Sequence, residues 1–292
     1  MKVAICRSAK AYLPDTDAYE AYLRTRGIAA RSVDDRREIA PDEIAILFRF
    51  EDQFARDVKA QRRVHEEHNI PVGVRGSLRS ALLAAGPKPD GQIRLEQADS
   101  SLPRPHCPTL VRPCGIDPAL FEVAPRPDPE FDLVYCGSLD RPGVLPEIER
   151  LAALGFTIAA YGRVPPGAPE ARMRAQGVRF FGRIGRSDLP AALANARAGL
   201  NFTPDRASWN QQESTKTLEY LAAGLPVVSN RYAWMDRFAE ERGADILWLD
   251  RIAGPQDLPS ASLERVDLSD RAWPTLLDRI GFIDFLGRVE AA

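Results

Sequence analysis

Residues 211–230 read QQESTKTLEYLAAGLPVVSN, and this stretch decides the fold class. Ser214 is a good N-cap for a helix, and residues 215–223 have helical composition. Gly224 suits the end of that helix, and Pro226 then opens a wholly apolar strand. A helix that leads directly into an apolar strand is typical of an α/β fold with a parallel sheet.

The same alternation extends outward from this stretch over most of the second half of the chain. It predicts strands at 132–137, 156–162, 178–182, 198–202, 226–229 and 246–249, and helices at 144–154, 168–176, 188–197, 214–223, 231–242 and from about Ser269. Ligands of such parallel sheets bind at the carboxyl ends of the strands. The second half is therefore predicted to be one doubly wound domain.

The first half shows the same rhythm. It predicts strands at 3–6, 44–48 and 70–74, a helix from about Thr16 to Gly27, a charged helix to about His68, and a short helix at 77–85. Residues 87–129 are rich in proline and contain TLVRPC at 109–114, so they mark a linker or domain boundary near 122–130. We therefore expect two successive α/β domains, residues 1–125 and 126–292.

Composition narrows the class of protein. Apolar residues make up 45% of the 292 residues and charged residues 27%, as in soluble globular domains, and no signal peptide or membrane-spanning run is visible. A net charge of −2 gives no bulk attraction to nucleic acid or to an anionic membrane. The cysteines (Cys6, Cys107, Cys114 and Cys136) form no C-x-x-C pair and are too few for a disulfide scaffold, so a cytoplasmic location is expected.

Arginine outnumbers lysine by 34 to 5, and several arginines directly follow predicted strands. They are Arg7, Arg49 and Arg75 in the first half and Arg141, Arg163, Arg183 and Arg231 in the second. Guanidinium groups at the carboxyl ends of strands suit an anionic ligand. A general bias toward arginine codons would give the same count, so both explanations stay open.

The start of the helix at 214–223 is a candidate anion site. It combines free N–H groups, the capping Ser214 and Lys216 in the first turn. A lysine there opposes the helix dipole, and a bound diphosphate would supply a reason for it. Glu219 follows about one turn later, close enough to reach sugar hydroxyls beside that phosphate. An ordinary surface lysine and a solvated glutamate are the structural alternative.

Four segments in the right order resemble GT-B glycosyltransferases, particularly the retaining family 4. The family's interdomain segment PNGVDxxxF resembles RPCGIDPALF at 112–121, and its first glycine loop resembles LVYCGSL at 133–139. Its V-x-F-x-G … L-P-x-L … A-D stretch resembles VRFFGRIGRSDLPAALANARAGLNFTP at 178–204, and LEAMAxGxPVVxS resembles LEYLAAGLPVVSN at 218–230. The resemblance covers about 112–230 and implies two facing Rossmann-like domains. It also implies that the last helix, about 269–290, returns toward an abbreviated first domain.

The resemblance implies roles for individual residues. Glu219 matches the glutamate that hydrogen-bonds the ribose of the nucleotide, and Gln211 lies at the position that contacts the donor sugar. The donor-binding set is completed by Gly137 and Ser138 beside the phosphates, Ser214 and Thr215 on the diphosphate, Arg183 and Ile184 beside the base, and Gly162 and Arg163. Candidates on the acceptor side are Arg7, Arg49 and Arg75.

The sequence departs from the family pattern at three positions. Gln211 replaces the first glutamate of the family's E-x7-E motif, Ser138 replaces an arginine of the glycine loop, and Pro142 stands where a lysine is expected. Arg141 and Lys216 are predicted to substitute as the cations that hold the leaving diphosphate.

Two residue pairs have metal-binding spacing and are interpreted otherwise. Asp15 and Asp17 form the Asp-x-Asp signature of the other glycosyltransferase fold, GT-A, but they precede a helix and are expected to cap it. His65 and His68 are three residues apart, but no third ligand accompanies them, so an exposed helix face is expected. Nothing near His106 supports a catalytic role. No metal or other cofactor is therefore expected, and the absence of G-x-G-x-x-G and Walker motifs argues against dinucleotide and ATP enzymes.

The resemblance implies a glycosyltransferase of polysaccharide biosynthesis. It would move a sugar from a nucleoside diphosphate sugar to a glycan or lipid-linked acceptor held by the first domain, with retention of anomeric configuration. Cations and a helix N-terminus, rather than a metal, would stabilise the departing diphosphate. No nucleic acid partner is expected. The protein is expected in the cytoplasm, and peripheral association with the inner face of the membrane is the alternative.

Two other functions stay open. A non-catalytic nucleotide-sugar-binding scaffold protein is motivated by the altered positions Ser138, Pro142 and Gln211. A nucleotide-sugar epimerase of the same architecture is disfavoured by the short chain and by the lack of a supporting acid/base pair.

Overall fold

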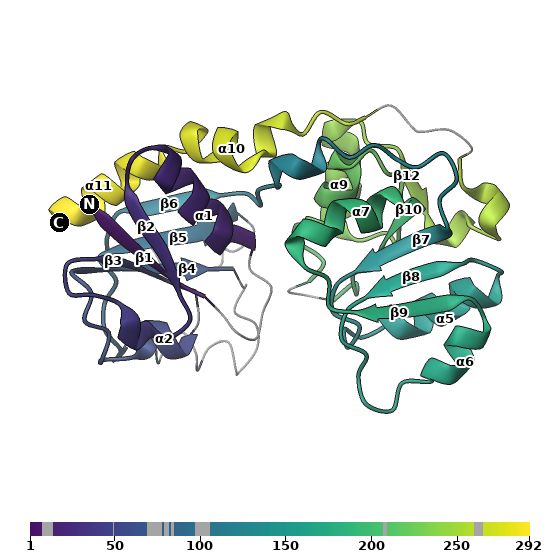
Figure 1. Ribbon diagram of the computed structural model, residues 1–292, viewed down its shortest axis with the longest axis horizontal. Helices are drawn as coiled ribbons and strands as arrows, with labels where there is room; N and C mark the ends of the chain where they lie inside the picture. Colours follow the sequence, from purple (N-terminus) through teal and green to yellow (C-terminus); the bar gives the residue numbers. More distant parts are fainter. Residues whose placement is uncertain are drawn as a thin grey trace. The chain divides into compact units, whose positions relative to one another are not determined.

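The computed structural model describes residues 1–7, 14–48, 50–68, 78, 82, 85–96, 106–206, 209–259 and 265–292. The chain divides into two compact units. The first consists of Met1–Gly115 together with Ser269–Ala292, and the second of Ile116–Leu268. Each unit contains a sheet of six parallel strands accompanied by helices (Figure 1). The predicted α/β class is confirmed.

The strands of the first sheet run in the order β2-β1-β3-β4-β5-β6. Their bounds are Lys2–Cys6 (β1), Ala29–Val33 (β2), Ile44–Leu47 (β3), Arg62–Glu67 (β4), Gly91–Leu95 (β5) and Thr109–Arg112 (β6). The described helices of this unit are α1 (Pro14–Thr25), α2 (Phe50–Phe54), α10 (Trp273–Arg279) and α11 (Phe282–Ala291), with 3-10 turns η1 (Arg36–Glu38) and η6 (Ser269–Arg271). Because all these strands are parallel, their carboxyl ends lie along one edge of the sheet.

Both faces of the first sheet carry an apolar core. On one face, the ring of Tyr19 in α1 packs at a tilt against that of Phe282 in α11 with ring centres 4.6 Å apart, and both pack in one cluster with Ile5 of β1. On the other face, Cys6 of β1 belongs to a second cluster with Leu47 of β3. A strand buried on both faces is apolar throughout, which is why β1 and β3 can be recognised in the sequence.

Residues 50–68 contradict the prediction of a charged helix. The helix α2 is short, and Arg62–Glu67 forms β4, an interior strand of the sheet. The charges of β4 have partners within the unit, since Arg63 donates to two backbone carbonyls and Glu66 pairs with Arg112. Tertiary partners therefore allow a strand where the local sequence lacks an apolar pattern.

Four further elements differ from the sequence-based expectation. The strands β5 and β6 lie within 87–129, which is not purely a linker, and β2 has no counterpart among the predicted strands. The predicted last helix, 269–290, is two helices separated at Gly281, whose φ of +65° favours glycine. The predicted strand at 70–74 lies outside the described residues, as does most of the short helix at 77–85.

The structure divides the chain after Gly115, before the expected boundary at 125/126. The segment that follows is fastened within the second unit by Arg265, whose guanidinium donates to the carbonyls of Phe121 and Val123 at 2.9 and 2.8 Å. The proline content of this segment predicts irregular backbone. It does not predict which unit the segment belongs to, because that depends on contacts with residues distant in the sequence.

The second sheet has the order β12-β11-β10-β7-β8-β9. Its strands are Phe131–Cys136 (β7), Ile158–Tyr161 (β8), Val178–Gly182 (β9), Ala196–Asn201 (β10), Val227–Ser229 (β11) and Ile246–Trp248 (β12). The described helices are α5 (Val144–Ala153), α6 (Glu170–Ala175), α7 (Leu189–Ala194), α8 (Thr215–Ala222) and α9 (Ala233–Arg242), with 3-10 turns at η2 (Pro118–Leu120), η3 (Arg186–Asp188), η4 (Leu249–Arg251) and η5 (Pro255–Asp257). The chain leaves β7 toward β9 and returns to β10 on the other side of β7. This reversal of strand order is where doubly wound sheets bind ligands.

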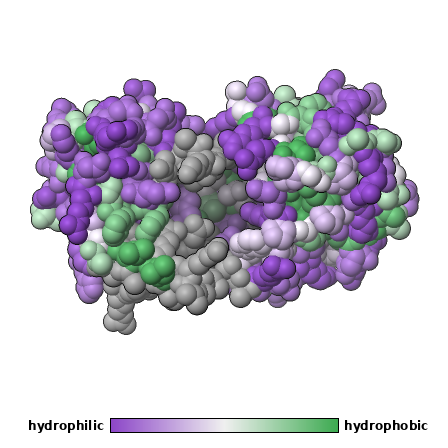
Figure 2. All heavy atoms as spheres, turned by 90° about the horizontal axis from the view of Figure 1, so that it is seen from below, coloured by the Kyte–Doolittle hydropathy of each residue, from purple (hydrophilic) through white to green (hydrophobic). Residues whose placement is uncertain are grey.

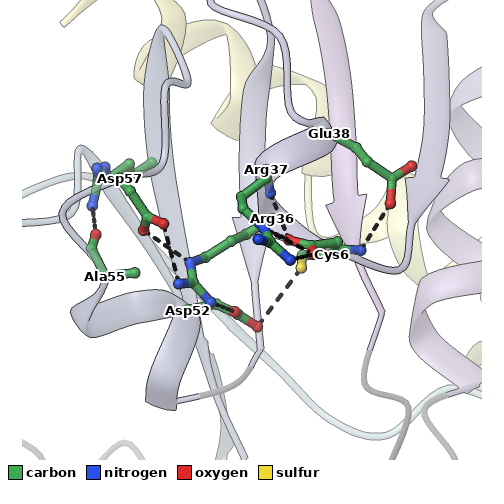
Figure 3. A network of polar contacts seen from close by, with 9 residues as sticks. Cys6, Arg36, Arg37, Glu38, Asp52, Ala55 and Asp57 are labelled. Carbon is green, nitrogen blue, oxygen red and sulfur yellow. Dashed lines mark hydrogen bonds and ion pairs between the residues drawn. The ribbon is translucent and has the colours of Figure 1, made fainter.

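A polar network joins the end of β1 to the turn after β2 and to α2 (Figure 3). Arg36 pairs with two carboxylates, those of Asp57 at 2.9 Å and Asp52 at 3.4 Å. The Cys6 thiol donates to the Asp52 carboxylate at 3.7 Å. Because Asp52 is buried, its carboxylate depends on such partners, and the network holds this corner of the first unit together.

Most of the surface seen in Figure 2 is hydrophilic, and some hydrophobic residues gather on the first unit. Exposed large apolar side chains of that unit include Phe54, Leu78 and Leu82. None of the described helices is both long enough and apolar enough to span a membrane.

Candidate functional site

The carboxyl ends of three adjacent strands in the second unit carry most of the predicted donor-binding residues. These are Gly137, Ser138 and Arg141 after β7, Gly162 and Arg163 after β8, and Arg183 and Ile184 after β9. Since β7, β8 and β9 are neighbours, the structure brings these loops to one edge of the sheet.

Two glycines allow these loops to pack tightly. A Cβ on Gly162 would lie 2.1 Å from the carbonyl oxygen of Gly137, closer than any real contact, so no side chain fits there. The amide of Gly137 donates to the Tyr161 carbonyl at 2.9 Å, and a Cβ on Gly137 would touch the stem of Lys216 at 3.4 Å. The backbone after β7 therefore lies directly against Lys216.

The helix α8 starts with a capped and firmly held residue. Ser214 accepts from the amide of Thr217 at 3.3 Å and donates to the side-chain oxygen of Asn201 at 2.9 Å. Asn201, at the end of β10, donates in turn to the Ser229 hydroxyl at the end of β11. The Ser214 hydroxyl is thus used within the fold, whereas Thr215, the first residue of the helix, is exposed. A contact of this helix start with a phosphate would come from backbone N–H groups.

Tyr220 fixes the position of α8, and the sequence-based reading did not identify it. Its ring packs so closely on Gly199 of β10 that a Cβ there would lie 2.2 Å from the ring. Its hydroxyl accepts from the amide of Cys136 at 2.9 Å, at the end of β7. One residue therefore ties α8 to both strands that flank the reversal of strand order. The signal in the sequence that could have identified Tyr220 is the glycine within β10, which leaves room for a bulky residue on the next helix.

Lys216 and Glu219 lie in an environment that disfavours charge. The pKa of Lys216 is lowered to about 7, first by burial and then by the charge of Arg141, and Glu219 acts in the opposite direction. Burial likewise raises the pKa of Glu219 to about 7, against the effect of Lys216. Lys216 is only 8% exposed, its amine lies 5.7 Å from the ring centre of Tyr135, and no described carboxylate forms a close ion pair with it. A buried amine without an ion-pair partner is poised to accept an anionic ligand.

Arg141 and Gln211 lie on the loops around this lysine. The Arg141 guanidinium lies over the ring of Trp209, 5.9 Å from its centre, in a cation–π contact. Gln211 is exposed in the loop before α8, where the amide of Trp234 donates to the carbonyl of Asn210 at 2.9 Å. The structure thus leaves the Gln211 side chain accessible beside the start of α8.

An ion pair that the sequence-based reading missed also acts on Glu219. Asp117, just before η2, pairs with Arg186 at the start of η3. Among the charges that influence the pKa of Glu219, Arg186 lowers it and Asp117 raises it. Asp117 belongs to the segment that resembles the family's interdomain motif, but nothing in the sequence links it to Arg186.

The other described arginines that were predicted to follow strands are exposed, and most of them contact a carboxylate or an aromatic ring. Arg163 is exposed and lies 3.8 Å from Asp140, and Arg183 is exposed. Arg231 stacks over Trp248 at 4.0 Å. On the acceptor side, Arg7 is exposed and pairs with carboxylates of α1, whereas Arg49 and Arg75 lie outside the described residues.

The structure corrects the interpretation of the two pairs with metal-binding spacing. His65 and His68 belong to β4 and the residue after it rather than to an exposed helix, and His65 is buried, with its pKa lowered to about 4 by burial and by Arg63. Asp15 is buried too and pairs with Arg112 instead of only capping α1. The carboxylates of Asp15 and Glu66 and a ring nitrogen of His68 lie within 4.8 Å of one another.

Known proteins share this architecture. Residues 144–252 match the protein family described as glycosyl transferase-like. The structure resembles AviGT4, a glycosyltransferase involved in avilamycin A biosynthesis, with a TM-score of 0.65 and 14% identity over 100% of this chain and 98% of that one. It also resembles HepE of Anabaena in complex with UDP-glucose, with a TM-score of 0.55 and 13% identity over 100% of this chain and 93% of that one. No curated protein matches the sequence. The chain has the GT-B fold, as predicted, and the match to the glycosyl transferase-like family lies within its second unit.

Proposed function

We propose that this chain transfers a sugar from a nucleoside diphosphate sugar, bound by the second unit, to a glycan or lipid-linked acceptor bound by the first. The observation that carries the proposal is Lys216, a buried amine without an ion-pair partner at the point where the strand order reverses. Keeping such an amine buried destabilises the free protein, and a bound diphosphate would supply the missing negative charge. HepE, whose fold is similar, has been solved with UDP and with UDP-glucose, so UDP-sugars are the first donors to test.

In this proposal Lys216 and Arg141 hold the diphosphate together with backbone N–H groups at the start of α8. The charge of Arg141 acts on Lys216, since it lowers the pKa of that lysine. Negative charge grows on the diphosphate as the glycosidic bond breaks, and prearranged cations stabilise that charge most in the transition state. No metal is needed for this role.

The other residues of the site would recognise the two ends of the donor. Glu219 would accept hydrogen bonds from the two ribose hydroxyls, and Gln211 would contact the transferred sugar. Arg183 and Ile184 would border the base. Gly137 and Ser138 would line the site beside the phosphates, where a side chain on the glycine would meet Lys216. Retention of configuration, and a location in the cytoplasm at the inner face of the membrane, belong to the same proposal.

A panel of UDP-, GDP- and TDP-sugars tests the function directly. Release of nucleotide from one of them, with free or transferred sugar as the second product, is the expected result. Tight binding without release would support the non-catalytic scaffold instead. Conversion of the sugar with the nucleotide still attached would support an epimerase. Binding of the correct nucleoside diphosphate should also raise the melting temperature, because the ligand binds only the folded chain.

A further inference from the structure

The loop between β10 and α8 presents Trp209 at the carboxyl edge of the second sheet. Trp209 is partly buried and lies two residues before Gln211, which is exposed in the same loop. Ligands of doubly wound sheets bind at this edge. An indole ring that stays partly exposed here is placed to contact the ligand of the second unit.

Hydrogen bonds fix the backbone on both sides of this tryptophan. The amide of Trp209 donates to the carbonyl of Arg206 at 2.9 Å, and the carbonyl of Trp209 accepts from the amide of Gln212 at 3.0 Å. The carbonyl of Asn210 accepts from the amide of Trp234 at 2.9 Å, which ties the loop to the start of α9. The indole is therefore carried by a backbone whose polar groups are paired within the second unit.

Arg141 links the indole to the buried lysine of the site. Its guanidinium lies over the ring of Trp209, 5.9 Å from the ring centre. After burial, the charge of Arg141 is the second cause that lowers the pKa of Lys216, so the two cations are close to one another. Arg141 follows β7 and Trp209 follows β10, and these strands are neighbours in the sheet. The indole therefore lies beside the pair of cations that would hold the diphosphate.

The order of the site residues along the chain puts the indole toward the sugar end of the donor. Glu219 lies one turn beyond Lys216 in α8 and would bind the ribose. Gln211 lies in the loop before α8 and would contact the transferred sugar. Trp209 belongs to the same loop as Gln211, so it lies on the side of the cations that is opposite to Glu219 along the chain.

We propose that Trp209 is a platform for the ring of the transferred sugar and that it helps to determine which sugars the site accepts. This inference rests on the proposed function and extends it to a residue outside the segments that resemble the family. The face of an indole ring is electron-rich, and the C–H bonds of a pyranose ring present weakly positive hydrogens to it. A flat platform also selects by shape, because a bulky substituent on the packed face of the sugar lifts it from the ring.

The contact between Arg141 and Trp209 is one that a diphosphate can displace. A charge-assisted hydrogen bond from a guanidinium to phosphate is stronger than the contact of that guanidinium with a partly exposed aromatic ring. Arg141 would therefore turn to the diphosphate as the donor binds, and the face of the indole would become available to the sugar. Because the ring competes with phosphate for Arg141, its removal should leave the affinity for a nucleoside diphosphate unchanged or slightly higher.

The platform should act on the rate of transfer as well as on binding. Cleavage of a glycosidic bond passes through a transition state in which the sugar ring carries positive charge. The electron-rich face of the indole attracts this charge, and the attraction is stronger in the transition state than in the bound donor. The indole forms no covalent bond and takes up no proton in this role. Loss of the ring should therefore slow the release of nucleotide.

Trp248 supplies the matched control. It is the last residue of β12 in the same sheet, it is also partly buried, and the guanidinium of Arg231 lies 4.0 Å from its ring centre. W209A and W248A therefore each remove one indole that lies under an arginine. W209F keeps a smaller aromatic face in the loop and should retain part of the activity, which also covers the case that W209A fails to fold.

The experiment compares each variant with the unmodified chain in binding and in nucleotide release. The ligands are the nucleotide-sugar of the panel that the unmodified chain binds best and the nucleoside diphosphate derived from it. W209A should bind the nucleoside diphosphate within about twofold of the unmodified affinity but release nucleotide from the donor about 10-fold more slowly. The rates with the best and the second-best sugar of the panel should also become more alike. W248A should change none of these quantities.

The contrary results are distinguishable. If W209A releases nucleotide at the unmodified rate and with the same sugar preference, the role of Trp209 falls and the proposed function stands. If W209A loses affinity for the nucleoside diphosphate as much as for the donor, Trp209 holds the loop and not the sugar, and the assignment falls. If the unmodified chain binds a nucleotide-sugar but releases no nucleotide, the transfer function falls, and an unchanged affinity of W209A for that donor overturns the platform. If it binds no member of the panel, both fall.

Discussion

Replacing Lys216 by Met should stabilise the protein while it weakens nucleotide binding. Moving the pKa of a lysine from 10.5 to about 7 corresponds to about 5 kcal/mol in favour of the neutral amine. Relaxation and water penetration reduce such penalties in real proteins, so we expect K216M to gain about 2 kcal/mol. Methionine keeps the apolar stem that packs beside Gly137. For a domain of this size the gain corresponds to a melting temperature about 4–8 °C higher.

The gain should depend on pH in a defined direction. The folded chain holds Lys216 with a pKa of about 7, whereas the unfolded chain holds it near 10.5. Between these values the unfolded chain binds more protons, so the stability of the unmodified protein rises with pH through this window. The advantage of K216M should therefore be largest below pH 7 and should vanish near pH 10.5. Glu219 changes the advantage of K216M little at pH 6, because the raised pKa of Glu219 keeps this carboxyl group largely protonated at that pH.

Thermal unfolding at pH 6 and pH 9, with and without UDP, measures both effects. K216M should melt higher than the unmodified chain at pH 6 and should lose most of the shift that UDP produces. The exposed Lys59 supplies the control, since K59M removes an equal charge from the surface of the other unit. A variant K216M that melts lower at pH 6 and binds UDP with unchanged affinity would refute the assignment of Lys216 as a buried diphosphate ligand.

Three further predictions concern the same site. R141A should weaken binding of UDP about 10- to 100-fold and that of uridine much less, because a charge-assisted bond to phosphate contributes about 1.5–3 kcal/mol. Calorimetric titration with both ligands measures the two losses. Equal losses for UDP and uridine would contradict the assignment. E219A should weaken binding of UDP and of the nucleotide-sugar alike, whereas Q211A should impair transfer and sugar preference with little effect on UDP affinity; the reverse pattern in a competition assay would show that the two roles are misassigned. G162A should lower the melting temperature and abolish UDP binding, because its methyl group would lie 2.1 Å from the Gly137 carbonyl oxygen; a crystal structure of this variant with UDP in place would disprove the need for close packing there.

The second unit could largely be predicted from the sequence because its determinants are local. The helix α8 has its cap, its apolar face and its terminating glycine within residues 214–224, and the following strand is apolar throughout. Lys216 and Glu219 could be placed by their positions in that helix. Their shifted pKa values could not, because burial is the largest cause of each shift and depends on the whole unit.

The first unit was harder to predict, because its strands contain charged residues whose ion-pair partners are far away in the sequence. The β4 sequence RRVHEE has no apolar alternation, and Glu66 in it pairs with Arg112, 46 positions away in the sequence. His68 looked like part of an exposed helix for the same reason. Only the sheet order, which places β4 and β6 on either side of β5, brings these side chains together. Pairings of this kind leave no periodic signal along the chain.

The order in which the ribosome delivers the two units has a consequence for how the protein reaches its native state. The first unit includes the last residues of the chain, Ser269–Ala292, and the terminal amine of Met1 lies 3.2 Å from the carboxylate of Glu290. At about 5–20 residues per second, the second unit takes on the order of ten seconds to synthesise. During that time the face of the first sheet that α11 will cover, including Tyr19, lacks its partner Phe282. We therefore expect the second unit to fold first, although it is synthesised later. We expect chaperones to bind the incomplete first unit in the meantime. A circular permutant that joins the two termini and opens the chain after Gly115 would make the first unit contiguous and remove that delay.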